Sequence, residues 1–192
     1  MWQVDLAQRA ETVRSLAALL SEVERERAAR LKRPGAADRW TVARAALRIL
    51  LGAHTGLLPE EVELEIAEHG KPELSATRLC FNLTHSGDLA LIALAEIEVG
   101  IDVERPGRNT AAVERTLSPG ERASGDDWLQ IWCRKEALAK AMGGGLQWAP
   151  QDFDTTRPDG HAIADLPLAD GYVGALAAAG DSAAFTLHRL SL

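Results

Sequence analysis

Short strand-like runs alternate with amphipathic helical patterns along this chain, and turns rich in glycine or proline separate them. Apolar residues recur at helical spacing in three stretches, at residues 12–31, 40–51 and 128–142. Short apolar or alternating runs predict strands at residues 62–66, 79–83, 89–95, 99–104, 172–179 and 183–190. These elements form two successive sets, 1–95 and 96–192, with no low-complexity linker between them. The pattern predicts an α+β protein with small, mostly antiparallel sheets.

The composition is that of a globular protein, and it excludes several other classes. An apolar share of 46% and a charged share of 26% over 192 residues suit a chain that buries a core. No apolar run approaches the roughly 18 residues of a membrane span. Charged residues in the first turns do not fit a signal peptide. Two cysteines, Cys80 and Cys133, are too few for a disulfide scaffold or a zinc site. We therefore expect a reduced, cytoplasmic protein with no membrane partner.

Positive charge is concentrated in one segment of this acidic chain. The net charge is −7, which disfavours general nucleic-acid binding. Residues 25–48 nevertheless hold eight Arg or Lys residues against two acidic ones. A basic patch on an acidic protein fits local recognition of an anion. A solvated, arginine-rich helix face would have the same composition, so the segment leaves both interpretations open.

The run VGIDVE at residues 99–104 is the most informative local pattern. Alternate side chains of a strand share a face, so Ile101 points into a core while Asp102 and Glu104 point the other way. The Cα atoms of two such residues lie about 7 Å apart. Carboxylates so close repel each other unless a cation lies between them, and oxygen ligands suit Mg²⁺ or Mn²⁺. Gly100 leaves room for a bulky group against the backbone. A solvent-facing strand with ordinary charges is the alternative.

The predicted helix at residues 128–142 carries the second pattern, WCRKEALAK at residues 132–140. Trp132, Glu136 and Lys140 are spaced so that they share one helix face. Glu136 is a candidate metal ligand or base, and Lys140 is a candidate phosphate contact. An exposed Glu–Lys pair beneath a packed tryptophan would have the same spacing.

A polar loop in the run FNLTHSG, residues 81–87, is the third candidate. The Thr84 hydroxyl and the His85 imidazole can both hydrogen-bond a phosphate, and a charged imidazole adds attraction. A structural His85 is the alternative, and no G-x-S-x-G elbow supports a serine nucleophile.

Further along, Ser118 and Glu121 have the spacing of a helix capping box, the role we favour for Glu121. Asp126 or Asp127 can cap the next helix.

Taken together, these segments resemble the 4′-phosphopantetheinyl transferases of the surfactin-synthetase-activating (Sfp) type, over roughly residues 25–155. That family carries fN(I/L)SHS, then (V/I)G(I/V)D(I/V)E, then W-x-x-KEA followed by a lysine. FNLTHS, VGIDVE and WCRKEA with Lys140 stand here in the same order. The turn GKP at residues 70–72, Arg39 and the run LSPGE at 117–121 also resemble family positions. Thr84 replaces the usual serine and keeps its hydroxyl.

The resemblance implies two similar α+β halves in one chain, with the active site in the cleft between them. The N-terminal half, 1–95, then binds the coenzyme A phosphates, and the C-terminal half, 96–192, carries the metal and the catalytic groups. The implied reaction moves the 4′-phosphopantetheine arm of coenzyme A onto a serine of an apo acyl or peptidyl carrier protein and releases adenosine 3′,5′-bisphosphate. Such carriers serve fatty-acid, polyketide or nonribosomal peptide synthesis. Two fused halves complete one site, so we expect a monomer.

The resemblance also implies roles for individual residues. It implies that Mg²⁺, or Mn²⁺ in its place, is held by Asp102, Glu104 and Glu136. It implies that Glu136 also takes the proton of the attacking serine and that Lys140 offsets charge on the leaving phosphate. It implies that the phosphates of coenzyme A are contacted by Arg39, Lys71, Thr84 and His85.

Two other functions use the same residues. A catalytically silent relative would bind coenzyme A or a carrier protein without turnover, although the three carboxylates and the lysine are all present. A metal-dependent phosphohydrolase would use the carboxylates with water and would need no carrier surface.

Overall fold

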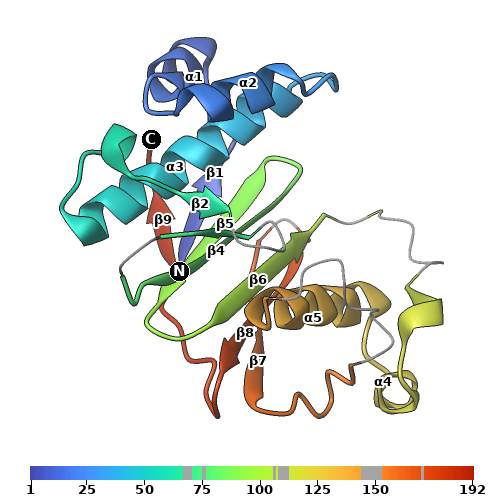
Figure 1. Ribbon diagram of the computed structural model, residues 1–192. Coiled ribbons are helices and arrows are strands. Elements are labelled where there is room, and N and C mark those ends of the chain that lie inside the picture. Colours follow the sequence, from blue (N-terminus) through green and yellow to red (C-terminus); the bar gives the residue numbers. More distant parts are fainter. Residues whose placement is uncertain (67–70, 75–76, 106, 108–112, 144–152, 170) are drawn as a thin grey trace.

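The computed structural model describes residues 1–192 apart from 67–70, 75–76, 106, 108–112, 144–152 and 170 (Figure 1). The strands are β1 (Trp2–Asp5), β2 (Glu65–Ile66), β3 (Pro72–Glu73), β4 (Cys80–Ser86), β5 (Leu89–Ala95), β6 (Val99–Glu104), β7 (His161–Asp165), β8 (Val173–Ala179) and β9 (His188–Leu190). The helices are α1 (Ala10–Ala17), α2 (Glu22–Ala29), α3 (Ala36–Thr55), α4 (Pro119–Ser124) and α5 (Trp128–Ala141), with short 3₁₀ turns η1 (Pro59–Glu61) and η2 (Glu114–Thr116). The mixed α+β class predicted from the sequence is confirmed.

Two sheets form the centre of the molecule. The strand order of the first sheet is β4-β5-β1-β9, and its pairs are antiparallel except for β1 with β9. The second sheet has the order β6-β8-β7 and is antiparallel throughout. A short ribbon of β2 and β3 lies apart from both. Through β9, the end of the chain completes the sheet that the first half begins.

Three of the apolar clusters in the described residues pack the helices and sheets in the order helix, sheet, sheet, helix (Figure 1). The first part packs α3 on the first sheet and includes Leu47 and Ile92. The second lies between the two sheets and includes Leu91 and Ile101. The third packs α5, including Ala137, on the outer face of the second sheet. Burial of these three apolar interfaces fixes each helix against its own sheet.

Gly100 allows α5 to lie directly on β6. A Cβ atom placed on Gly100 would lie 2.0 Å from the Ala137 carbonyl oxygen and 2.4 Å from the Ala141 nitrogen. Only a hydrogen atom fits in that space, as is common where two backbones approach closely. The bulky group that the sequence predicted beside Gly100 is therefore the helix that carries Lys140.

The N-terminal helices differ from the sequence prediction in a way that capping explains. Two helices, α1 and α2, replace the single helix expected over residues 12–31. Ser21 starts α2, since its hydroxyl accepts a hydrogen bond from the Glu24 backbone nitrogen while the Glu24 carboxylate accepts one from the Ser21 nitrogen. This S-x-x-E capping box was visible in the sequence. α3 begins earlier than predicted and runs through Gly52, and Gly56 ends it in the left-handed conformation.

Other predictions had mixed outcomes. The caps at Ser118 and Asp127 are confirmed, because each side chain accepts hydrogen bonds from the first turn of its helix. β1, β3 and β7 were not predicted, and the strands expected at residues 62–66 and 183–190 are shorter in the structure. The turn at Gly70 and the end of the glycine run at residues 144–145 lie outside the described residues. No helix in the described part of the chain is long and apolar enough to cross a membrane.

Candidate active site

Asp102 lies where β6, β4 and α5 meet. Its side chain is 7% exposed. The Oδ1 atom accepts a hydrogen bond from the Lys140 amine at 2.6 Å and another from the Thr84 hydroxyl at 3.1 Å. The same amine donates to the Ile101 carbonyl at 3.1 Å, which fixes it against the strand. Three of the predicted site residues, from three elements, are therefore in direct contact.

The second carboxylate oxygen of Asp102 has a different environment. Oδ2 is buried, and no hydrogen-bond partner for it is found within the described ranges. A buried oxygen without a partner costs free energy that a bound cation would remove. Glu104 follows on the same face of β6, at the end of the strand. This all-oxygen donor set fits a hard divalent cation such as Mg²⁺ or Mn²⁺.

Glu136 lies on α5, one helical turn before Lys140, and is half-buried. That spacing makes its side chain leave the same face of α5 as the lysine amine. Across the part of the chain that the structure describes, no three His, Cys, Asp or Glu side chains form a group that could hold a metal ion. The structure brings Asp102 and Lys140 together without adding Glu136 to a three-carboxylate group, so its role as a ligand stays a prediction.

α5 is held in place from its other side by a buried ion pair. The Lys135 amine lies 2.8 Å from Glu121 Oε2, and both side chains are at most 1% exposed. The amine also donates to the Phe153 carbonyl at 2.6 Å. Burial raises the pKa of Glu121, but hydrogen bonds from Lys135, Thr155 and the Ser118 backbone together hold it below its usual value. Glu121 is thus the helix cap that we favoured and also a partner of α5.

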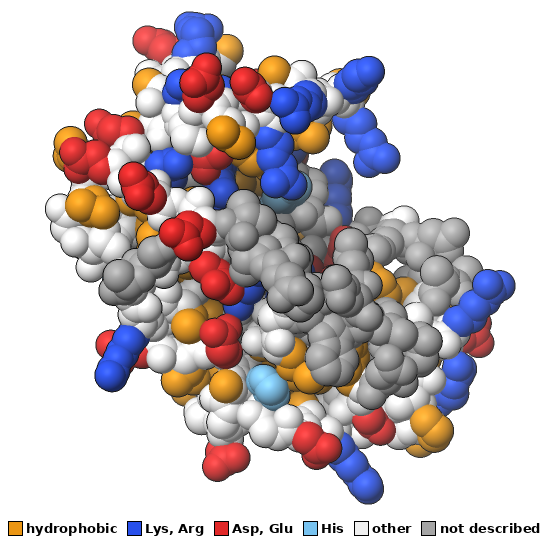
Figure 2. All heavy atoms as spheres, in the orientation of Figure 1, with side chains coloured by type: hydrophobic (Ala, Val, Ile, Leu, Met, Phe, Trp, Pro, Cys, Tyr) orange, Lys and Arg blue, Asp and Glu red, His pale blue; other side chains and the backbone are white. Residues whose placement is uncertain are grey.

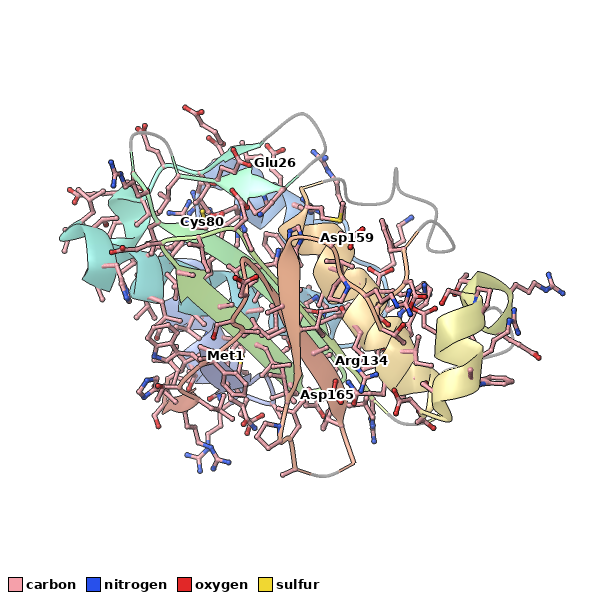
Figure 3. All side chains as sticks on the ribbon, turned by 90° about the horizontal axis from the view of Figure 1, so that it is seen from below. Met1, Glu26, Cys80, Arg134, Asp159 and Asp165 are labelled. Atoms are coloured by element: carbon pink, nitrogen blue, oxygen red, sulfur yellow. The ribbon has the colours of Figure 1, made fainter. Side chains whose placement is uncertain are left out.

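Arg134 adds a second attachment between α5 and its surroundings. Its guanidinium contacts both carboxylate oxygens of Asp165 on β7, at 2.8 and 2.6 Å (Figure 3). It also lies 2.6 Å from Asp126, just before the helix. A two-pronged arginine–carboxylate contact fixes orientation as well as distance. These contacts and the Gly100 approach position Glu136 and Lys140 relative to β6.

Basic and aromatic side chains line two adjoining hollows between α2, α3 and β4. One, of about 710 Å³, is lined by residues that include Arg30, Lys32, Arg33, Arg39, Trp40 and His85. The other, of about 220 Å³, is lined by residues that include Arg27, Trp40, Arg44, Phe81 and His85. Figure 2 shows Lys and Arg side chains gathered over α2 and the loop that follows it. We call the two hollows, which meet at Trp40 and His85, the basic cleft.

The arginines of α3 are paired with carboxylates, and one of them is buried. Arg48 is buried, and it bonds Glu24 at 2.7 Å and two backbone carbonyls. Arg44 bonds the same carboxylate through its Nε atom at 2.5 Å. Arg39 bonds Asp88 through Nε at 2.6 Å. The basic segment found in the sequence is therefore partly structural, in Arg48, and partly a set of anchored cations at the cleft.

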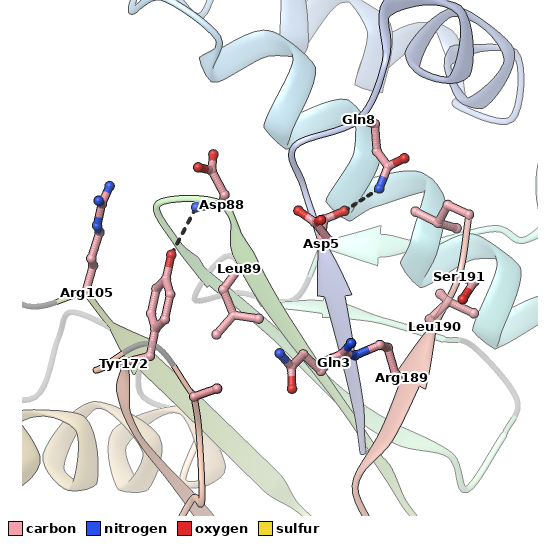
Figure 4. A pocket seen from close by; sticks show the side chains of 12 residues that line it. Gln3, Asp5, Gln8, Asp88, Leu89, Arg105, Tyr172, Arg189, Leu190 and Ser191 are labelled. Carbon is pink, nitrogen blue, oxygen red and sulfur yellow. Dashed lines mark hydrogen bonds between the residues drawn. The ribbon is translucent and has the colours of Figure 1, made fainter.

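Asp88 links the basic cleft to the second sheet. Its carboxylate holds Arg39, and its backbone N–H donates to the Tyr172 hydroxyl at 3.3 Å (Figure 4). The Tyr172 hydroxyl lies in a separate hollow of about 660 Å³ beyond the β4–β5 turn. Sequence reasoning missed Asp88, because no local pattern reveals a contact between a turn and a distant helix.

Two of the four residues predicted to contact coenzyme A line the basic cleft, Arg39 and His85. Burial, the Lys140 amine and the Arg39 guanidinium lower the pKa of His85. Thr84 instead points at Asp102, and Lys71 lies at the end of α5, where it pairs with Glu98 at 2.9 Å and is 3.5 Å from the Lys140 carbonyl oxygen. Contact of these four residues with coenzyme A stays a prediction.

Two carboxylates near a strand end, a lysine against one of them and a basic cleft alongside suit an enzyme that acts on phosphate groups. Residues 98–172 match the 4′-phosphopantetheinyl transferase superfamily. The 4′-phosphopantetheinyl transferase HetI of Nostoc sp. is 34% identical over 163 residues, which cover 76% of this chain and 69% of that protein. AcpT of Salmonella typhi is 38% identical over 135 residues, 63% of this chain and 68% of AcpT. The Bacillus subtilis enzyme is 29% identical over 174 residues, 84% of this chain and 76% of its own length. The chain belongs to the 4′-phosphopantetheinyl transferase superfamily. The resemblance to this family that the sequence motifs indicated is confirmed, and the protein is a transferase.

Proposed function

We propose that this protein transfers the 4′-phosphopantetheine arm of coenzyme A to a serine of an apo acyl or peptidyl carrier protein, with Mg²⁺, and releases adenosine 3′,5′-bisphosphate. Family membership supports the type of reaction. The observation that carries the proposal is the Asp102 carboxylate, which has one oxygen on the Lys140 amine and one buried oxygen with no partner in the described residues. The basic cleft lies nearby, since His85 follows the Thr84 that contacts Asp102. We expect the protein to act as a monomer in the cytoplasm.

The proposed reaction is a nucleophilic substitution at phosphorus. The serine oxygen bonds to the phosphorus atom that carries the pantetheine arm, and the bond from that phosphorus to the bridging diphosphate oxygen breaks. Glu136 accepts the serine proton. Asp102, Glu104 and Glu136 would hold the divalent ion, Mg²⁺ or Mn²⁺, and the bound ion would supply positive charge that offsets the negative charge of the diphosphate. Lys140 supplies a further positive charge for the leaving bisphosphate.

The basic cleft suits a ligand as anionic as coenzyme A, which carries about four negative charges. Asp88 anchors Arg39 through one nitrogen, and a guanidinium has further N–H donors for a phosphate. His85 lines both hollows of the cleft. Thr84 and Lys71 complete the predicted contacts of the coenzyme A phosphates.

One experiment tests the function against its two alternatives. The protein is incubated with coenzyme A, Mg²⁺ and an apo carrier protein, and the carrier is weighed by mass spectrometry. A mass gain of one phosphopantetheine arm, abolished by EDTA, is the expected result. Cleaved coenzyme A with an unchanged carrier would indicate a hydrolase. Bound but intact coenzyme A would indicate a silent relative.

A matched pair of variants tests the metal site. Asp102→Ala is expected to lower turnover by about 10²- to 10³-fold, the scale for removing one preorganised electrostatic group. Asp181→Ala, at an exposed position after β8, serves as the control and should transfer at the normal rate. Near-normal turnover of Asp102→Ala at saturating Mg²⁺ would remove Asp102 from the metal site.

A further inference from the structure

Polar side chains on one face of β4 join that strand to β6, although the two strands belong to different sheets. Asn82, Thr84 and Ser86 alternate along β4 and therefore share a face. The Asn82 side-chain oxygen accepts a hydrogen bond from the Ile101 backbone nitrogen at 3.0 Å. Thr84 donates to Asp102 two positions further along β4, at 3.1 Å. Side chains of β4 thus take the place of a backbone partner along this edge of β6.

Ser86 makes the last contact of this series, at the end of β6. Its hydroxyl donates to Glu104 Oε2 at 3.2 Å and accepts a hydrogen bond from the Arg105 backbone nitrogen at 3.0 Å. A serine hydroxyl has a single hydrogen. Because the oxygen faces the Arg105 N–H, that hydrogen is directed at the Glu104 carboxylate. Both partners of Ser86 lie in one short segment, so the hydroxyl fixes the carboxylate relative to its own backbone.

We propose that Ser86 is a positioning residue that orients the Glu104 carboxylate for the divalent cation of the proposed reaction. The inference rests on the proposed function for the identity of that cation. Glu104 ends its strand, and a glutamate side chain that must be ordered when a ligand binds loses rotamer entropy at that step. A carboxylate already held by Ser86 avoids most of that loss. Groups that orient metal ligands typically contribute about 10- to 100-fold in metal affinity.

This role differs from the one that the sequence motif suggests for neighbouring residues. Thr84 and His85 are predicted to contact the phosphates of coenzyme A. A Ser86 hydroxyl that served the phosphates would change coenzyme A affinity and leave metal affinity unaltered. A hydroxyl that orients Glu104 would do the reverse. The two affinities therefore separate the roles.

The test measures metal binding directly, by the EPR signal of free Mn²⁺ titrated with protein, with and without coenzyme A and with no carrier present. Ser86→Ala is expected to weaken Mn²⁺ binding by about 10- to 100-fold. Ser86→Thr, which restores the hydroxyl and suits a strand, should return the affinity to within about threefold of wild type. Ser124→Ala is the matched control, because that hydroxyl also donates to one group and accepts from another, but on α4. It should bind Mn²⁺ as wild type does.

Two results would overturn the proposal. One is unchanged Mn²⁺ affinity in Ser86→Ala, with or without weaker coenzyme A binding. The other is failure of Ser86→Thr to restore an affinity that the alanine variant lost. If Ser86→Ala does not fold, Ser86→Cys is tested in its place. It is also expected to weaken Mn²⁺ binding, because a thiol has a similar shape but is a weak hydrogen-bond donor. Failure of the proposed function would show separately, as wild-type protein that binds Mn²⁺ but leaves the carrier unmodified.

Discussion

Replacement of Gly100 by alanine tests whether the contact between α5 and β6 positions the site. The new Cβ would lie 2.0 Å from the Ala137 carbonyl oxygen and 2.4 Å from the Ala141 nitrogen, both backbone atoms. Real Cβ atoms essentially never come closer than 3.0 Å to another atom, so helix and strand must separate by about 1 Å. No side-chain rotation can relieve the overlap. The variant therefore moves Lys140 and Glu136 away from Asp102.

The size of the effect follows from two opposing contributions. Overpacking costs about 1–3 kcal/mol, and rigid backbone on both sides favours the upper end. Alanine recovers about 0.5–1 kcal/mol over glycine inside a strand. The free energy of unfolding should therefore fall by about 2 kcal/mol, which lowers the melting temperature of a chain this long by about 4–8 °C. The protein remains folded at 25 °C, because domains of this size have about 5–15 kcal/mol of stability.

The turnover rate should fall by about 100-fold, because a shift of about 1 Å in a catalytic group lowers the rate by about that factor. Melting is followed by circular dichroism, and transfer is followed by mass spectrometry of the carrier. Gly120→Ala is the control, because the atoms within 3 Å of its new Cβ are the side-chain ends of Asp154 and Thr156, which can turn away. It should melt within about 2 °C of wild type and remain active. If Gly100→Ala behaved like this control, the close approach of α5 to β6 would not position the site.

Two further predictions concern the pKa shifts and the buried ion pair. The pKa of His85 is lowered in the free protein, and a phosphate bound beside it should raise that pKa, so coenzyme A binding should take up a proton and tighten as the pH falls toward the lowered pKa of the free protein. Calorimetry in two buffers of different ionisation enthalpy measures the uptake, and a His85→Gln variant with the same uptake as wild type would contradict the assignment. Lys135→Met leaves Glu121 without its buried cation and should cost about 3–5 kcal/mol in urea unfolding at pH 7. In the wild-type protein the folded state lowers the pKa of Glu121, so its carboxylate stabilises the fold at pH values above its pKa in the unfolded chain. That stabilisation is lost as the pH falls through the pKa of Glu121 in the folded protein. An acid-unfolding transition that is the same in Lys135→Met as in wild type would refute this account.

Sequence patterns predicted the helices and strands that carry a cap or an apolar periodicity within their own residues. α5 was predicted because a cap at Asp127 precedes a long helical period, and β6 because apolar and acidic residues alternate around Gly100. β1 was missed, since it pairs with β5 and β9, which lie far from it in the sequence. Short segments of this kind become strands through their partners and not through their own composition. The break between α1 and α2 could have been predicted from the capping box at Ser21.

Local patterns place the candidate site residues on shared faces, but they do not predict the contacts between those residues. Strand alternation placed Asp102 and Glu104 on one face, and helix periodicity placed Glu136 with Lys140. The contact between the Lys140 amine and Asp102 depends on how closely α5 approaches β6, which the sequence suggests only through Gly100. The contact of Thr84 with Asp102 depends on how β4 of one sheet and β6 of the other come together, and no local pattern describes that arrangement.

The charges around Asp102 imply that cation and coenzyme A depend on each other in the proposed reaction. The Lys140 amine, 2.6 Å from Oδ1, already balances one carboxylate charge. A divalent ion beside it would meet repulsion from that amine and lose part of its hydration, costs that the predicted ligands Glu104 and Glu136 would have to offset. The diphosphate of coenzyme A adds the missing negative charge, and the ion in turn lowers the repulsion between that diphosphate and the acidic groups of β6. We therefore expect the ion and coenzyme A to bind more firmly together than either does alone, which would let an acidic strand end serve an anionic substrate.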